Sequence, residues 1–280
     1  MFEREVQVAG EIARAAGAGV LEAYGTDLHI AYKSPGDPVT AADLRASEQI
    51  VDGLRRAFPD DGVVTEEDPD TRASQRAGRC WYVDPIDGTK EFIQRTGQFA
   101  VMIGLAVNGE ATVGAIYEPT RAVLYSGVVG QGAFAHSDDG APPRPLHVSE
   151  RSDPSTLRLT SSRANRTEAI DYLVAELGIT DEIRSGSAGV KVGHIVERRA
   201  DLYVHAWRHS SAWDTCGPEA VLRAAGGVMT DLRGEPFVYG AGDDGDLHNP
   251  YGILACTRAA FPGVRSAALE LGVRAGLFER

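Results

Sequence analysis

The sequence predicts a layered α+β protein in the order α-β-α-β, in which residues 1–145 form an α+β half and residues 146–280 form an α/β half. The first half begins with two amphipathic helical patterns, which are followed by a run of short strand patterns. In the second half, strand and helix patterns alternate, as they do in layered α/β folds. A stretch rich in Pro, Gly and Asp, residues 137–147, lies between these patterns and is predicted to be a linker.

Two helices are expected at the start of the chain. Apolar residues recur at spacings of three and four over residues 2–24, which predicts an amphipathic helix. Thr40 is predicted to cap the second helix, because Asp43 follows three residues later as in a capping box. Its apolar stripe is predicted to include Leu44, and the helix is expected to stop at Phe58.

Short strands fill the rest of the first half. They are predicted at residues 62–65, 80–83, 99–107, 111–117, 123–129 and 132–136. Asn108-Gly109 supplies the backbone geometry of a two-residue hairpin turn between the third and fourth of these strands. The first two strands both run into a carboxylate, Glu66 and Asp84 respectively.

Strands and helices alternate in the second half. Strands are predicted at 157–161, 202–206, 227–231 and 251–255, and helices at 167–177, 190–199, 217–225 and 257–271. Pro218 suits the first turn of the helix 217–225, so Asp214 just ahead of it is suited to a helix cap.

Composition limits the classes of function. With 28 Lys plus Arg against 40 Asp plus Glu, the net charge is −12, which argues against a nonspecific nucleic-acid binder. No apolar run approaches the length of about 18 residues that a membrane span needs. The three cysteines form no CxxC pair and no disulfide pattern, so we expect a cytoplasmic protein.

Four carboxylates near the predicted strand and helix ends are the strongest chemical signal. Asp84 and Asp87 stand at i and i+3 in a predicted turn, where their oxygens and a backbone carbonyl between them can converge on a hard cation such as Mg²⁺. Glu66 and Asp214 are further candidate ligands. Asp-Pro and Asp-Gly are also common turn dipeptides, so a purely structural role is the alternative. Because gathered acids repel one another, we favour a site for two or more divalent ions.

A site of this kind indicates phosphomonoester hydrolysis, since paired divalent ions polarise a phosphoryl group and lower the pKa of a bound water. Thr89 follows the second aspartate closely, and its hydroxyl paired with Asp43 is the candidate for accepting and passing on a proton. Gly88 has no side chain, so backbone N–H groups there can approach a phosphate.

Three segments resemble the signatures of the inositol monophosphatase superfamily, the Mg²⁺-dependent, lithium-sensitive phosphatases: Glu66-Glu67, Asp84-Pro-Ile-Asp-Gly-Thr89 and Trp213-Asp214. The resemblance spans nearly the whole chain and implies an inositol monophosphatase-like (sugar phosphatase) fold. It also implies about two or three Mg²⁺ ions per site, with Asp43 and Thr89 activating water. The metal ligands that it implies are Glu66, Asp84, the Ile86 carbonyl, Asp87 and Asp214.

Two further segments resemble the 3′(2′),5′-bisphosphate nucleotidases of that superfamily. Lys90-Glu91 stands where inositol monophosphatases usually carry Thr-Asn, and residues 187–191 are similar to the nucleotidases' phosphate segment. The resemblance implies removal of the 3′-phosphate of adenosine 3′,5′-bisphosphate, a by-product of sulfur metabolism. An inositol-1-phosphate or sugar phosphatase is the alternative, and a noncatalytic nucleotide or metal sensor is a more remote one.

Lysine is rare in this chain, since only Lys33, Lys90 and Lys191 are found among the 28 basic residues. Lys and Arg are not interchangeable at phosphate sites, so these positions favour ligand contacts. Lys191, together with Ser187, is expected to bind the nonreacting phosphate. Lys33 lies in a segment, residues 32–40, that resembles the family's mobile loop.

The expected substrate contacts are Gly88, Thr89, Lys90, Ser162, Ser187, Lys191 and Asp214. Ser162 belongs to a segment that resembles a nucleotide contact of the family, although residues 164–166 depart from it where some relatives have a histidine. As partners we expect a small phosphorylated nucleotide, no nucleic acid and no membrane, with a homodimer as the candidate assembly.

Two histidines and a tryptophan close to Asp214 carry weaker signals. His205 and His209 are four residues apart, but one lies on a predicted strand, where this spacing does not suit a zinc site. Trp207 is predicted to be a packing residue, and a stacking surface for adenine is the alternative.

Overall fold

The computed structural model describes residues 1–26, 30–34, 37–68, 78–163, 166–240 and 247–279. The helices are α1 (Glu3–Tyr24), α2 (Ala41–Ala57), α3 (Thr89–Ile93), α4 (Glu168–Leu177), α5 (Ala188–Val196), α6 (Ala212–Ala224) and α7 (Phe261–Arg274). No helix of this part of the chain is long and apolar enough to cross a membrane.

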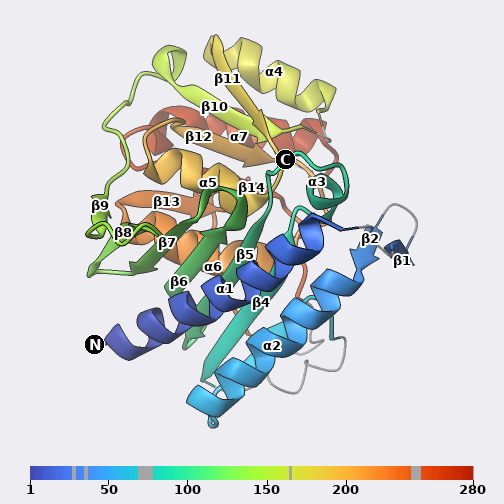
Figure 1. Ribbon diagram of the computed structural model, residues 1–280. Helices are drawn as coiled ribbons and strands as arrows, with labels where there is room; N and C mark the ends of the chain where they lie inside the picture. The colour runs from blue at the N-terminus through green and yellow to red at the C-terminus, as the bar shows by residue number, and fades with distance from the viewer. Residues whose placement is uncertain (27–29, 35–36, 69–77, 164–165, 241–246, 280) are drawn as a thin grey trace.

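The helices and the two large sheets stack in alternate layers (Figure 1). The strands are β1 (Ile30–Ser34), β2 (Asp37–Thr40), β3 (Gly62–Thr65), β4 (Arg79–Asp87), β5 (Ala100–Val107), β6 (Glu110–Glu118), β7 (Val123–Val128), β8 (Gly132–Ser137), β9 (Arg144–Leu146), β10 (Arg158–Ser162), β11 (Asp181–Ser185), β12 (Leu202–His205), β13 (Gly227–Thr230) and β14 (Ile253–Thr257). The predicted mixed, layered fold class is confirmed, and α4 with α7 adds a fifth layer on the outside.

The first sheet has seven strands in the order β3-β4-β5-β6-β7-β8-β9. Neighbouring strands in this sheet are antiparallel, except β3 and β4, which are parallel to each other. The hairpin turn between β5 and β6 is confirmed, because Asn108 and Gly109 have φ values of 52° and 84°. β9 lies inside the stretch predicted to be a linker and pairs with β8, so residues 144–146 belong to this sheet.

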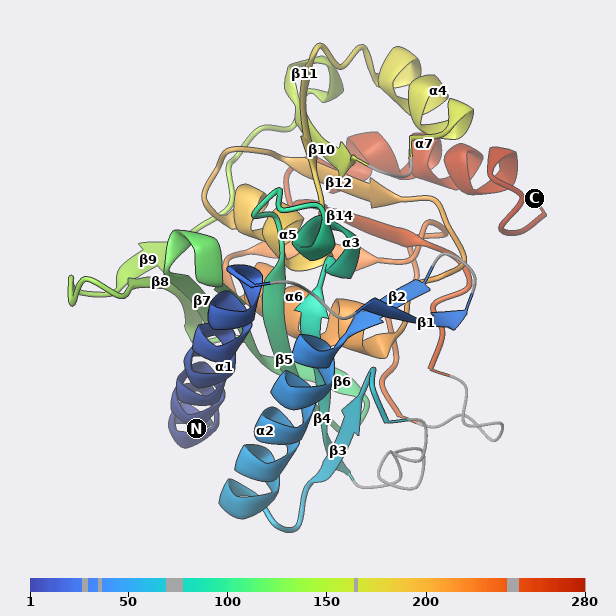
Figure 2. The same ribbon diagram turned by 45° about the vertical axis from the view of Figure 1, so that its right-hand side comes forward.

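Helices α1 and α2 cover one face of the seven-stranded sheet (Figure 2). The predicted capping box of α2 is present, with Thr40 as the cap and Asp43 bonded back to its backbone N–H. Leu44, which was expected in the apolar stripe, is 52% exposed because it lies on the opposite side of the helix from Ala42 and Ala46. The cap therefore holds Asp43 buried at the start of the helix.

Helices α5 and α6 form the layer between the two sheets. Three glycines let α6 lie directly against the first sheet. A Cβ atom at Gly104 would stand 2.3 Å from the backbone N of Gly217, and one at Gly114 would stand 2.2 Å from its carbonyl oxygen. Since Asp214 lies one helical turn before Gly217, this close contact positions its carboxylate beside the first sheet.

The predicted start of α6 is wrong. The helix begins at Ala212 after the cap Ser211, so Asp214 lies within its first turn instead of ahead of it. Pro218 is inside the helix. Because proline has no N–H, the carbonyl of Asp214 loses the donor that a residue four positions later normally supplies.

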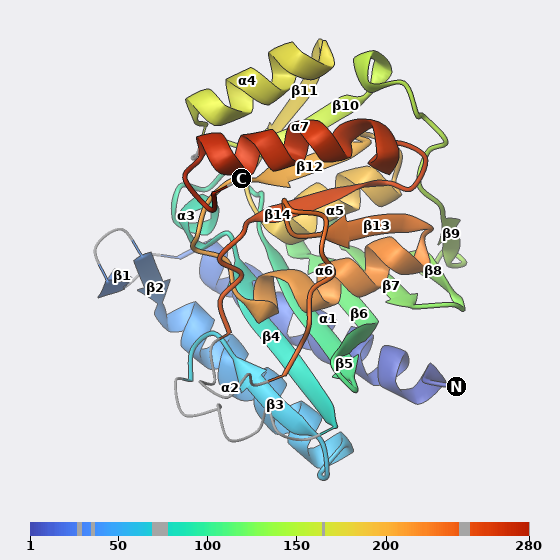
Figure 3. The same cartoon turned by 180° about the vertical axis from the view of Figure 1, so that it is seen from behind.

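The second sheet has the order β11-β10-β12-β14-β13, and α4 and α7 cover its outer face (Figure 3). β10 is parallel to both β11 and β12. Sequence patterns missed β11, because this edge strand, Asp181–Ser185, is mostly polar. They also missed β1 and β2, and placed β14 and α7 two to four residues too early.

Candidate active site

Three carboxylates from β4 and α6 converge at one point. Asp84, Asp87 and Asp214 each offer an oxygen, and these oxygens lie within 4.8 Å of one another. In a regular strand, residues three apart point to opposite faces. Here Asp84 pairs with Met102 and Asp87 with Ala100, so three steps on β4 face two on β5. This bulge brings both side chains to one side, and it replaces the tight turn predicted after residue 83.

Glu66 lies at the same end of the sheet because β3 runs parallel to β4 and its backbone continues the pairing, with the N–H of Glu66 donating to Val83. The ammonium group of Lys33 lies 2.6 Å from Glu66 Oε1 and 3.0 Å from Glu67 Oε1. The structure thus places the segment ahead of α2 next to the acidic cluster. Residues 35–36 of that segment lie outside the described residues.

The pKa values report the crowding of negative charge. Burial raises the pKa of Asp84 well above its ordinary value, and the charges of the neighbouring carboxylates raise it further. The pKa of Asp214 is raised well above its ordinary value by the same two causes. Burial and the charge of Glu66 also raise the pKa of Glu67 to about 7. A cation relieves this repulsion, and a set of carboxylate and carbonyl oxygens fits a hard divalent ion.

The backbone between the two aspartates also faces this cluster. The N–H of Ile86 donates to Asp84 Oδ1 at 3.0 Å, which holds the first carboxylate in place. The carbonyl oxygen of Ile86 lies 3.1 Å from Thr89 Oγ1, but the single hydroxyl proton of Thr89 can go to Asp43 instead, which leaves both carbonyl lone pairs to face a cation.

Asp43 and Thr89 meet beside the cluster, as expected from the sequence. The hydroxyl of Thr89 donates to Asp43 Oδ1 at 3.0 Å. The other carboxylate oxygen of Asp43 accepts the N–H and the hydroxyl of Thr40 at 2.8 and 2.5 Å. Burial raises the pKa of Asp43, and its hydrogen bonds partly offset that effect. A threonine oriented in this way presents its oxygen lone pairs to a water molecule.

Asp87 has a second role at the N-terminus of α5. Its Oδ2 accepts the hydroxyl of Ser187 and the N–H of Gly189, the latter at 2.8 Å. Ser187 caps α5 and also accepts the N–H of Val190 at 3.1 Å. The hydroxyl proton of Ser187 is therefore already used within the protein, so a phosphate contact from this residue would need its backbone or a rearranged hydroxyl.

Lys191 is more deeply placed than a surface phosphate ligand. The residue is 4% exposed, and its ammonium donates to the carbonyls of Gly186 and Ser187 at 3.2 and 2.7 Å. It also lies 5.0 Å from the ring centroid of Tyr203. Burial lowers the pKa of Lys191, and nearby carboxylates, first that of Asp87, oppose this. Since an ammonium has three N–H groups, one is left for a ligand.

A cavity of about 180 Å³ lies next to the carboxylates. Six of the seven expected substrate contacts line it: Gly88, Lys90, Ser162, Ser187, Lys191 and Asp214. Thr89 is not among the lining residues. Of the departure at residues 164–166, residues 164–165 lie outside the described part of the chain. His205, His209 and Ser210 also line the cavity, and the sequence analysis did not predict this. The polar run just ahead of the Trp213-Asp214 signature could have indicated these lining residues.

Known proteins that resemble this chain include two kinds of phosphatase. Residues 3–261 match the inositol monophosphatase family. The chain is 34% identical to the 3′(2′),5′-bisphosphate nucleotidase CysQ of Escherichia coli K12, over 82% of this chain and 91% of that protein. It is 28% identical to the inositol-1-monophosphatase of Bacillus subtilis, over 83% and 87% of the two chains.

Solved structures of similar proteins cover nearly the whole chain. The structure of CysQ from Bacteroides thetaiotaomicron has a TM-score of 0.75 and 31% identity, and the match covers 92% of this chain and 99% of that one. The inositol monophosphatase from Anabaena has a TM-score of 0.74 and 27% identity over 96% of each chain. Both kinds of phosphatase therefore share this architecture.

Proposed function

The chain belongs to the inositol monophosphatase family of phosphatases, and we propose that it removes the 3′-phosphate of adenosine 3′,5′-bisphosphate, giving AMP and phosphate. The observation that carries this proposal is the convergence of Asp84, Asp87 and Asp214 beside a cavity that two of the three lysines line. The identity to the Escherichia coli bisphosphate nucleotidase, 34%, is higher than the 28% identity to the Bacillus subtilis inositol-1-monophosphatase, which supports the nucleotide substrate.

The family generally uses Mg²⁺, and the donors of this chain suit it. The groups that would hold the ions are Glu66, Asp84, the Ile86 carbonyl, Asp87 and Asp214. When bound, divalent ions supply Lewis acidity toward the phosphoryl group and the attacking water. All of these donors are oxygens, which is the ligand type that Mg²⁺ prefers.

Thr89 and Asp43 would handle the proton of the attacking water. As the water oxygen bonds to phosphorus, its proton passes to Thr89 Oγ1, and the hydroxyl proton of Thr89 passes to Asp43 Oδ1 at 3.0 Å. Burial helps Asp43 hold that proton, since it raises the pKa of the carboxyl group. The bond between phosphorus and the 3′ oxygen breaks, and the ribose oxygen takes a proton from solvent.

The lysines would bind the phosphate that does not react. Lys90 is exposed at the cavity, where a mobile ammonium can follow a phosphate. Lys191 lies deeper and keeps one N–H beyond its two carbonyl partners. Two cations in the cavity beside the acidic cluster suit a substrate with two phosphate groups better than one with a single phosphate.

A phosphate-release assay tests the proposal directly. Purified protein would be supplied with adenosine 3′,5′-bisphosphate, inositol 1-phosphate and fructose 1,6-bisphosphate, each over a Mg²⁺ titration and in EDTA. We expect the highest kcat/KM for the nucleotide and no turnover in EDTA. Faster turnover of inositol 1-phosphate would instead establish the second candidate, an inositol or sugar phosphatase, which the Bacillus subtilis relative favours. Binding of the nucleotide without turnover would indicate a sensor.

A further inference from the structure

Two buried polar atoms on the β12 side of the cavity have no hydrogen-bond partner among the described residues: Nε2 of His205 and Oγ of Ser210. Both residues line the same cavity as Lys191, and Ser210 is only 3% exposed. Buried polar groups are nearly always paired, and an unpaired one lowers the stability of the fold. Two such atoms in the wall of one cavity therefore point to a ligand that pairs with them.

Strand geometry explains why His205 faces the cavity. Residues two apart on a strand share a face, so His205 lies on the same face of β12 as Tyr203, whose ring contacts Lys191. The parallel register between β10 and β12 pairs Thr160 with Tyr203. If this register continues for two more residues along both strands, Ser162 lies beside His205. A ligand that extends past Lys191 therefore meets His205 next.

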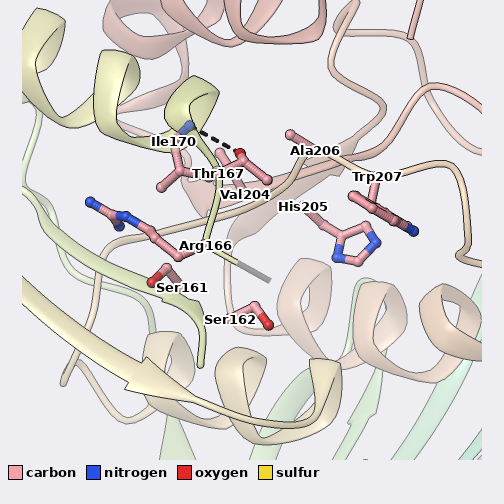
Figure 4. A pocket seen from close by; sticks show the side chains of 9 residues that line it. All are labelled: Ser161, Ser162, Arg166, Thr167, Ile170, Val204, His205, Ala206 and Trp207. Carbon is pink, nitrogen blue, oxygen red and sulfur yellow. Dashed lines mark hydrogen bonds between the residues drawn. The ribbon is translucent and has the colours of Figure 1, made fainter. Parts of the chain in front are cut away.

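A second, smaller recess adjoins this point and shares Ser162 and His205 with the main cavity (Figure 4). Hydroxyl groups of Ser161 and Thr167 line it, together with apolar side chains of Ile170, Val204, Ala206 and Trp207. Arg166 lines it as well, but its guanidinium is paired with Asp171 and Glu182. Trp207 is 44% exposed, so its prediction as a packing residue is wrong. The surroundings of His205 thus combine an aromatic face with hydroxyl groups, which suits an uncharged ring that forms hydrogen bonds.

The charge around His205 favours an uncharged ligand group as well. Burial lowers the pKa of His205 to about 4, and the nearby Lys191 and His209 add to this effect. The imidazole is therefore neutral near pH 7, with one N–H donor and one acceptor nitrogen. Ser210 is also neutral. Lys90 and Lys191, which can neutralise a phosphate, line the same cavity, so the neutral His205 is left to a part of the ligand that carries no charge.

We propose that His205 and Ser210 hydrogen-bond the uncharged nucleoside part of the substrate and so determine specificity for nucleotides over small phosphate esters. This inference rests on the proposed function, because it takes the reacting phosphate to lie at Asp84 and Asp87. It adds two residues that act on the group beyond that phosphate and not on the reacting atoms.

Three substitutions at position 205 test the hydrogen bond. The side-chain amide of Gln reaches the position of the histidine Nε2 atom, and that of Asn reaches the position of Nδ1. Ala has no polar group at either position. For His205→Ala we expect the ratio of kcat/KM for adenosine 3′,5′-bisphosphate to that for p-nitrophenyl phosphate to fall about tenfold, mainly through KM. His205→Gln should recover most of the ratio and His205→Asn should not. An unchanged ratio in His205→Ala would overturn the inference.

Binding of AMP, measured by calorimetry, separates this inference from the proposed function. We expect His205→Ala and Ser210→Ala each to weaken AMP binding several-fold, with His147→Ala, an exposed histidine outside the cavity, as the matched control. If inositol 1-phosphate proves the better substrate while AMP binding still depends on His205, the proposed function fails and the nucleoside contact stands. If adenosine 3′,5′-bisphosphate is the preferred substrate but His205→Ala and Ser210→Ala bind AMP as tightly as the control does, the nucleoside contact is refuted and the proposed function stands.

Discussion

The hydroxyl oxygen of Thr89 lies 3.0 Å from Oδ1 of Asp43, although 46 residues separate them in the sequence. The capping box of α2 fixes the carboxylate, and α3, which begins at Thr89 just after β4, fixes the threonine. This relationship makes the pair testable as a proton acceptor, because the hydroxyl of Thr89 can be removed while Asp43 and the capping box of α2 are kept.

Removal of the hydroxyl in Thr89→Ala is expected to lower kcat by about 10² to 10⁴, with little effect on KM, because the proton of the attacking water loses its acceptor. Thr89→Ser keeps a hydroxyl and should recover most of the activity. Steady-state kinetics with the preferred phosphate ester would measure both variants. A larger change in KM than in kcat would contradict a role in proton transfer.

Asp87→Asn is expected to lower turnover at least about a hundredfold and to weaken the stabilisation by Mg²⁺, since a metal ligand should matter at least as much as the groups that orient it. Its amide oxygen can still accept from Gly189, so α5 should stay in place. Thermal melting with and without Mg²⁺ is the measurement, and Asp52→Asn, an exposed acid on α2, is the control. Wild-type stabilisation by Mg²⁺ in Asp87→Asn would refute the metal assignment.

Lys33→Met is expected to raise the apparent affinity for Mg²⁺ about threefold, because the ammonium that pairs with Glu66 at 2.6 Å opposes a second cation there. Both side chains are partly exposed, 27% for Lys33 and 22% for Glu66, and solvent screening keeps the expected effect small. Lys33→Arg keeps the charge and should behave like the wild type. Calorimetric titration with Mg²⁺ would check this, and a weaker affinity in Lys33→Met would show that the lysine assists the metal.

Lys191→Met is expected to raise KM for a bisphosphate nucleotide about tenfold more than for the matching monophosphate, since a charged hydrogen bond to the second phosphate is lost. Methionine keeps an apolar stem against Tyr203. The carbonyls of Gly186 and Ser187 also lose a donor, so thermal melting must accompany the kinetics. Equal losses for both substrates would indicate a structural role alone.

The raised carboxyl pKa values predict how stability depends on pH. Burial raises the pKa of Glu67 to about 7, with Glu66 adding to the shift, so the folded state binds more protons than the unfolded state between about pH 4.5 and pH 7. Without divalent ions, the free energy of unfolding should therefore fall as pH rises through that range. Melting curves in EDTA and in Mg²⁺ would test this, and Mg²⁺ should stabilise more at pH 8 than at pH 5. Equal stabilisation at both values would contradict the coupling.

Sequence alone was sufficient where the deciding contacts are local. Thr40 and Asp43 form a capping box within one helical turn, and Asn108-Gly109 forms a hairpin turn within two residues. Carboxylates at the ends of two apolar strands also predicted where the acidic cluster lies. In the cap and the turn, the residues that decide the geometry are neighbours in the chain, so their pattern is visible in the sequence.

Tertiary structure decided everything that depends on which segments meet. The bulge that brings Asp84 and Asp87 to one side is defined by pairing with β5, and the burial of Lys191 depends on α5 packing against Tyr203. The same holds for His205, whose partnerless nitrogen is recognised only once β12 and the cavity are in place. The sequence names the chemical groups, but burial and partners arise from contacts between distant segments, and these determine what each group can do.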